Sequence, residues 1–187
     1  MEALDPVPQA VSRDDLRAAK HLPAHAADDD VLDACLQTAQ AVVETACARP
    51  MGKRQVVFEV AAGEWRRWWF PVAPIVSVDA LEMADGVGGW QPIVADAQVQ
   101  FGWRAPQLVV TSSGLPAIGT ELRIVATAGY DTGKWPPQMA QAIKLLAAEW
   151  YEAEISPEGV PLSELSFAAK NLIRQVRYIR PFEFGAA

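Results

Sequence analysis

The sequence predicts an α+β fold in which a small helical bundle carries an antiparallel β insertion resembling a sandwich or barrel. Apolar residues recur at the helical period near both ends of the 187-residue chain. Short β-prone pieces separated by Gly and Pro fill the stretch between them. The expected divisions are N-terminal bundle helices at 1–54, the β insertion at 55–134, a third bundle helix and linker at 135–162, and a C-terminal basic amphipathic helix and tail at 163–187.

Two helices are expected before the β insertion. Ser12 is followed three residues later by Asp15, which is close to a capping box, and Pro23 ends this short helix. A second helix follows the aspartates at 28–30 and keeps its apolar spacing until residues 49–52 stop it. The aspartates suit a helix N-terminus, where the backbone dipole favours carboxylates; a cation site is the functional alternative.

About seven short strands are expected in the β insertion. The pieces are rich in β-branched and aromatic residues and alternate with Gly/Pro turns, which is typical of an antiparallel sandwich or barrel. Their expected ranges are 56–60, 65–70, 75–82, 90–94, 99–101, 108–111 and 122–127.

Two further helices are expected after the insertion. Pro137 suits a first helical turn, and the broad apolar face behind it continues to about Glu154. A Pro/Gly linker at 156–161 then precedes an amphipathic helix over roughly 163–180.

Charge is unevenly distributed along a chain whose formal net charge is -7. Residues 1–48 hold nine acidic and three basic side chains, whereas residues 163–187 hold two acidic and four basic ones. The acidic balance argues against a general DNA-binding surface, which needs a basic footprint. No apolar run has the length of a membrane helix, and residues 1–8 lack the basic start of a signal peptide.

Residue types that carry chemistry are scarce. Cys35 and Cys47 lie on one predicted helix about 18 Å apart, beyond disulfide reach, which fits two buried thiols in a protein made in a cytoplasm. His21 and His25 are separated by Pro23, which interrupts the helix that would align them on a metal. We therefore expect no catalytic set, no metal and no cofactor.

The segment at 65–69 concentrates Trp and Arg. On a strand, Trp65 and Trp69 share one face with Arg67, while Trp68 lies on the other. Such a strand could offer a stacking platform to sugars or bases, or pack in the core or against a neighbouring subunit. We favour packing because Trp is enriched at interfaces. The residues expected at a subunit interface are Trp65, Trp68, Trp69, Trp150 and Tyr151.

The last predicted helix carries a basic stripe. Lys170, Arg174 and Arg177 recur at helical spacing on one side of it, and Phe182 and Phe184 follow in the tail. One interpretation is a solvated helix face. The other is docking into an acidic or groove-shaped partner, with the two phenylalanines as anchors.

Four segments occur in a recognisable order and spacing. They are 12–22 followed by Asp29-Asp30 and the helix ending at Arg49; 70–78 with Asp85-Gly86 after it; 125–131; and Pro137 followed by 141–152. With this ordered set the chain resembles the head–tail connector proteins of long-tailed bacteriophages and gene transfer agents, also called adaptor or head-completion proteins. Ala153-Glu154 departs from the family, in which a basic residue often stands there.

The resemblance implies a structural virion protein without enzymatic activity. It implies a twelve-fold ring in the head–tail neck, beneath the portal protein, which extends the DNA channel and offers a platform to tail-side proteins such as a stopper or tail terminator. DNA would pass through without sequence-specific binding, and no membrane is involved. A carbohydrate- or ligand-binding module built on the 65–69 strand is the alternative function, and an enzyme ranks third.

Two surfaces can be assigned expectations on this basis. The acidic N-terminal region is expected nearer the channel, where carboxylates would repel DNA and let it slide. The channel-facing acids are Asp28, Asp29 and Asp30. The basic C-terminal region is the candidate for portal docking, through Lys170, Arg174, Arg177, Arg180, Phe182 and Phe184.

Overall fold

The computed structural model describes residues 2–4, 7–21, 28–63, 67–93, 97–101, 105–110, 116–153 and 166–181. The chain forms two compact units, each assembled from segments that are distant in sequence. The β unit comprises Met1–Val7, Lys53–Gly129 and Ile179–Ala187, and the helical unit comprises Pro8–Gly52 and Tyr130–Tyr178. The predicted α+β class is confirmed by the helices of one unit and the antiparallel sheets of the other.

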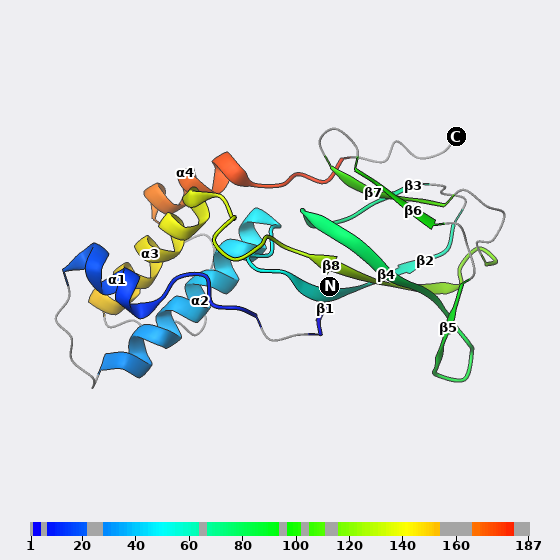
Figure 1. The fold of residues 1–187 in the computed structure, drawn as a ribbon, viewed down its shortest axis with the longest axis horizontal. Coiled ribbons are helices and arrows are strands. Elements are labelled where there is room, and N and C mark those ends of the chain that lie inside the picture. Colours follow the sequence, from blue (N-terminus) through cyan, green and yellow to red (C-terminus); the bar gives the residue numbers. More distant parts are fainter. Residues whose placement is uncertain are drawn as a thin grey trace. The chain divides into compact units, whose positions relative to one another are not determined.

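The helical unit contains α1 (Arg13–Lys20), α2 (Asp29–Cys47), α3 (Pro137–Glu152) and α4 (Phe167–Val176). Helix α3 contacts each of the other three, and Figure 1 shows it in yellow beside α4 in orange. Its Pro137 occupies the first helical turn, as predicted. Alanines at 39, 142 and 147 are fully buried, which lets the helix backbones approach closely.

The start of α1 is fixed by the capping box that the sequence predicts. Ser12 Oγ accepts a hydrogen bond from the Asp15 backbone N–H at 3.1 Å, and Asp15 Oδ2 accepts one from the Ser12 N–H at 3.2 Å. Two of the backbone donors that a helix N-terminus leaves unpaired are thereby satisfied. Leu16, one turn further on, is fully buried in the helical core.

The final helix is shorter than the sequence predicts. It ends at Val176, and Arg177 has extended dihedral angles. The backbone N–H of Tyr178 donates to the carbonyl of Cys47 at 2.8 Å instead of to a carbonyl of its own helix. A tertiary hydrogen bond therefore ends α4 about a turn early, at a place where the amphipathic pattern itself continues.

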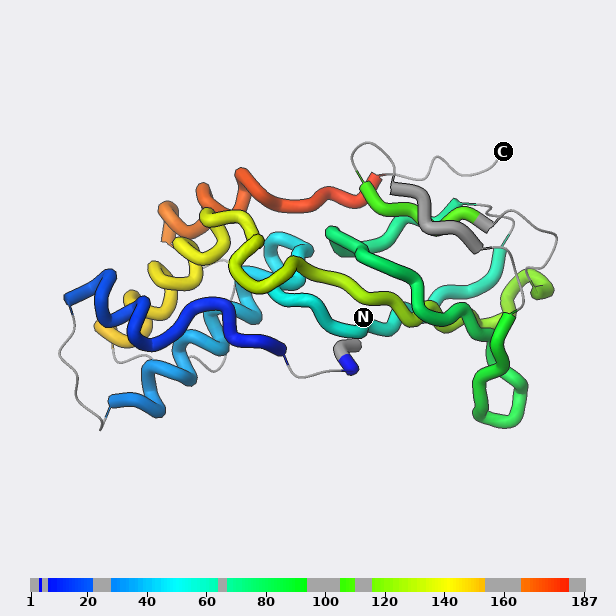
Figure 2. Tube along the Cα trace, viewed as in Figure 1, coloured from blue at the N-terminus to red at the C-terminus, as the bar shows by residue number. Residues whose placement is uncertain are grey.

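The β unit contains two antiparallel sheets, and Figure 2 traces their strands through the chain. The larger sheet has the order β1-β2-β8-β4-β5 and the smaller one β3-β7-β6. The strands are β1 (Glu2–Ala3), β2 (Arg54–Ala61), β3 (Arg67–Trp69), β4 (Ile75–Ala84), β5 (Trp90–Pro92), β6 (Ala97–Phe101), β7 (Pro106–Val110) and β8 (Glu121–Ala128). Seven of these match predicted strands; the two-residue β1 was not predicted.

The two sheets share one core. Phe58 of β2 and Trp68 of β3 meet edge to face with ring centroids 5.8 Å apart, and Phe70 packs edge to face against both. Leu108 of β7 and Ile124 of β8 belong to the same buried cluster. Side chains from both sheets thus meet in one apolar interior, as in a sandwich.

Candidate interaction surfaces

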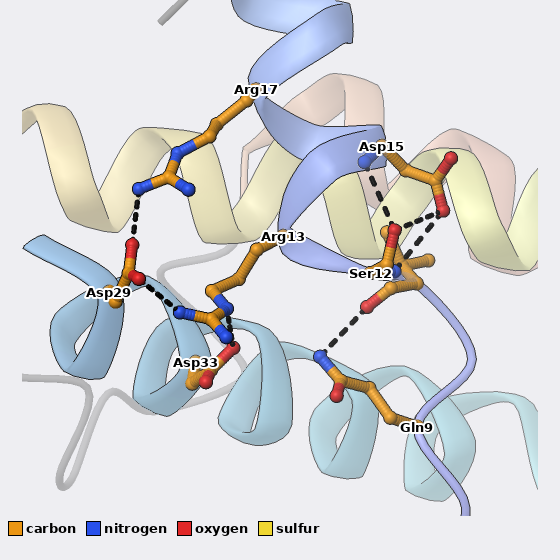
Figure 3. Close-up of polar contacts among 8 residues, drawn as sticks. Gln9, Ser12, Arg13, Asp15, Arg17, Asp29 and Asp33 are labelled. Atoms are coloured by element: carbon orange, nitrogen blue, oxygen red, sulfur yellow. Dashed lines mark hydrogen bonds and ion pairs between the residues drawn. The ribbon is translucent and has the colours of Figure 1, made fainter. Parts of the chain in front are cut away.

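The acidic start of α2 is occupied by arginines of α1. Figure 3 shows Arg13 between Asp29 and Asp33, and Arg17 paired with Asp29. The guanidinium of Arg13 lies 2.6 Å from the Asp29 carboxylate and 3.1 Å from that of Asp33. The hydrogen bond from Arg17 is the main reason why the pKa of Asp29 lies below its ordinary value, and the charge of Arg13 adds to it. Asp29 therefore joins two helices of its own unit.

The other two aspartates of this group differ from each other. Asp28 accepts a hydrogen bond from the Tyr151 hydroxyl at 3.1 Å, and this bond raises the pKa of Tyr151 because it stabilises the protonated phenol. Asp30 is exposed. Two of the three acids expected to face a channel thus make contacts within the helical unit, and their channel-facing role stays a prediction.

A groove of about 440 Å³ lies between the C-terminal end of α2 and the exposed side of α4. Its apolar part comes from Ala46, Phe167 and Ile173, and its polar part includes Lys170, Arg174 and Arg177. Phe167 is 80% exposed, which is unusual for an aromatic side chain at the first position of a helix. Among the described residues that line this groove, none carries a carboxylate.

Arg49, which follows α2, bonds to the last residue of α4. Its Nε donates to the carbonyl of Val176 at 2.6 Å, and its Nη1 donates to the hydroxyl of Tyr130 at 2.7 Å. The guanidinium thus satisfies a carbonyl at the C-terminal end of α4, where a positive charge is also favoured by the helix dipole. The end of α4 is therefore fixed to the end of α2 both here and at Tyr178.

The Trp-rich strand lies largely inside the β unit. Trp68 is 6% exposed, Trp69 is half-buried and Arg67 is exposed, so the predicted alternation of faces holds for these three residues. Trp65 lies outside the described residues. Trp68 consequently offers almost no area to a sugar, a base or a partner subunit.

The remaining predicted interface residues lie in α3. Trp150 is 5% exposed within the helical core, whereas Tyr151 is half-buried and bonded to Asp28. Only Trp69 and Tyr151, among the described members of the predicted interface set, keep substantial exposed area.

The predicted docking residues fall into two groups. Lys170, Arg174 and Arg177 line the groove, while Arg180 belongs to the β unit, where its guanidinium lies 5.3 Å from the ring centroid of Trp68. Phe182 and Phe184 lie outside the described residues. Phe167 was not predicted as a surface residue of this site. Its position off the apolar face of the predicted amphipathic helix could have indicated it.

Neither a metal centre nor a reactive thiol is evident in the described part of the chain. No three His, Cys, Asp or Glu side chains of those residues come close enough together to hold a metal ion. Cys35 and Cys47 are both free and buried, and burial raises the pKa of Cys47 to about 11. Within the same described residues, no helix has the length and apolar character needed to cross a membrane.

Comparison with known proteins relates almost the whole length of this chain to chains of gene transfer agent particles. It is similar to a chain of the neck of an empty gene transfer agent particle computed with C6 symmetry, with a TM-score of 0.79 and 26% identity. It is also similar to a chain of the virion of a native gene transfer agent particle, with a TM-score of 0.75 and 27% identity. A chain of the neck of a native gene transfer agent particle, computed with C12 symmetry, is similar with a TM-score of 0.74 and 26% identity. Each likeness covers 97% of both chains. No family model and no curated protein sequence matches the chain.

Proposed function

We propose that this protein is a ring-forming adaptor in the neck of a phage or gene transfer agent particle. The observation that carries the proposal is the similarity to neck chains, at TM-scores of 0.74 to 0.79, over 97% of this chain and 97% of theirs. A similarity that covers this much of the chain includes both units and the segments from which each is assembled. It is therefore a similarity of the whole fold, and more specific than a shared β sandwich would be.

The ring is proposed to have twelve copies. One similar chain comes from a neck computed with C6 symmetry and another from a neck computed with C12 symmetry. A twelve-fold ring satisfies both, because every C12 arrangement also has C6 symmetry. Closed cyclic rings bury the same two flanks of every subunit, and Trp69 and Tyr151 are the partly exposed aromatic residues proposed for those flanks.

In this proposal one face of the ring meets the portal protein and the other receives tail-side proteins. The C-terminal region, residues 163–187, is proposed to face the portal, since it has two acidic and four basic side chains in a chain of net charge -7. DNA is proposed to pass through the ring without sequence-specific binding.

An enzymatic role and a ligand-binding role both lack a supporting observation. The similar chains are components of virion particles. A stacking platform on the 65–69 strand would have to use the face of Trp69, since Trp68 packs against Phe58 and Phe70 in the core. The functional surfaces of the protein are therefore its interfaces with other subunits.

The test is deletion of the gene in producing cells, followed by complementation. Without the protein we expect heads that lack tails, and with the full chain we expect complete particles that contain it. The portal contact is tested with a chain that ends at Pro181 and so lacks Phe182 and Phe184. Removing all of 163–187 would also take Ala169 and Ile173 out of the helical core. A shortened chain that still enters particles at the level of the full chain would contradict the role of the tail.

A further inference from the structure

We propose that the groove between α2 and α4 receives residues 154–165 of a second copy of this chain. This inference rests on the proposed function, because a ring is what brings a second copy beside the groove. It assigns to Lys170, Arg174 and Arg177 a partner segment within the ring. Arg180 and the tail that follows it are then left for the portal.

The groove has the chemistry of a binding site for an acidic segment with apolar side chains. Lys170, Arg174 and Arg177 supply three positive charges, and the described lining residues supply no negative one. Ala46, Ile173 and the 80% exposed Phe167 supply apolar surface beside them. A volume of about 440 Å³ accommodates several side chains of an extended peptide.

Residues 154–165 complement this groove in charge and in apolar character. Glu154, Glu158 and Glu164 are their only charged side chains, so the segment is acidic where the groove is basic. The four aliphatic side chains of the segment are Ile155, Val160, Leu162 and Leu165. The C-terminal tail is the other candidate from this chain, but 182–187 holds a single acidic side chain, Glu183. Charge complementarity therefore favours 154–165.

Chain length favours a second copy over the same chain. The segment is tied to the helical unit at Ala153 and at Ser166, and Ser166 is the N-cap of α4. The distance from Ser166 to Arg177 along α4 is about 16 Å. A segment of the same chain that ran to Arg177 and returned to Ser166 would therefore need about 33 Å. Twelve extended residues span at most about 40 Å. Residues 154–165 of the same chain would need most of their length to run along the groove and back. The same residues of a neighbouring copy do not have to return to this α4.

Charge reversal in the full-length chain tests the pairing. The groove variant is R174E/R177E, the segment variant is E154K/E158K/E164K, and K53E/K134E, at two exposed lysines outside the groove, controls for added negative charge. Circular dichroism verifies that each variant is folded. Incorporation into particles is measured by quantitative immunoblotting of purified particles.

We expect the groove variant and the segment variant each to lose at least tenfold in incorporation, while the control stays at the level of the unmodified chain. Producing both variants together should restore incorporation, because each then offers the charge that the other lacks. A chain carrying both sets of changes should be restored as well. Rescue in the combined chain but not in the mixture would show pairing within one chain and would overturn the proposal.

Two other outcomes also decide the matter. A folded groove variant that enters particles normally overturns the proposed pairing but leaves the neck function in place. If the unmodified chain itself is absent from particles, the proposed function fails, and this result is distinguishable because it does not depend on any substitution.

Discussion

The guanidinium of Arg180 lies over the indole of Trp68, 5.3 Å from the ring centroid. Trp68 in turn meets Phe70 edge to face, with centroids 5.0 Å apart. A C-terminal cation therefore covers the aromatic core of the β unit. Two residues earlier, the N–H of Tyr178 donates to the carbonyl of Cys47 within the helical unit.

Replacing Arg180 by Ala should weaken the β unit slightly. A cation over a Trp ring at a partly exposed site contributes about 0.5–1 kcal/mol, and that amount should disappear from the free energy of unfolding. Urea denaturation followed by Trp fluorescence measures it. Arg174→Ala is the matched control, since Arg174 is an exposed arginine on α4. Equal stabilities for the two variants would show that the contact with Trp68 contributes nothing.

The tryptophans at 68 and 69 should behave very differently. Trp68 is 6% exposed in the shared core, so Trp68→Ala should cost about 3–5 kcal/mol or prevent folding. Trp68→Phe keeps an aromatic ring and should fold with a smaller loss. Trp69→Ala, at a half-buried position, should stay folded but impair ring assembly, which native mass spectrometry or electron microscopy of particles would record. Similar losses of stability at both positions would contradict the assignment of faces.

Asp29 should make the packing of α1 dependent on pH. Its pKa is lower in the folded chain than in the unfolded one, so its stabilising effect is present above about pH 4 and is lost as the pH falls through the folded value. Asp29→Asn should lower the thermal midpoint at pH 7 and flatten its decrease toward pH 2. The exposed Asp30→Asn is the control, and we expect it to keep the pH profile of the unmodified chain. An unchanged profile for Asp29→Asn would show that the pairs with Arg13 and Arg17 are unimportant in solution.

Glu44 should be essential to the end of α2. This carboxylate is 8% exposed, and its Oε1 accepts hydrogen bonds from Gln40 Nε2 at 3.0 Å and from the Met51 N–H at 2.9 Å. Glu44→Ala leaves buried donors without that acceptor, which should cost about 1–3 kcal/mol in chemical denaturation. Gln37→Ala, at an exposed position of the same helix, should cost much less.

The two cysteines should be inert in the folded protein. Both are buried, and burial holds the pKa of Cys47 at about 11, so little thiolate is present at pH 8. A disulfide reagent such as Ellman's should modify neither thiol within minutes in buffer and both in guanidinium. Rapid modification of the native chain would contradict the described burial.

Local signals in the sequence predicted most elements because their causes are local. The Ser12–Asp15 capping box, Pro137 at a first turn and the alternating strands each depend on neighbouring residues, and the structure has them where they were expected. The end of α4 was predicted wrongly because it depends on Cys47 and Arg49, which are distant along the chain. The two residues of β1 have no pattern of their own and become a strand only by pairing with Val56 and Val57.

The candidate surfaces were less predictable than the fold. The sequence identified the cations of α4 but not the groove, since Thr45 and Ala46 reach it only through helix packing. It identified an acidic cluster but not its partners, because Arg13 and Arg17 meet Asp29 across two helices. A linear charge pattern does not show which side chains will pair across different elements.

Cryo-electron microscopy of purified particles tests the central claim most directly. With the neck reconstructed without imposed symmetry, the account predicts one ring of twelve copies of this chain between the portal and the tail. Density for both the helical and the β unit should be visible in every copy. A complete neck from which this chain is absent would contradict the account.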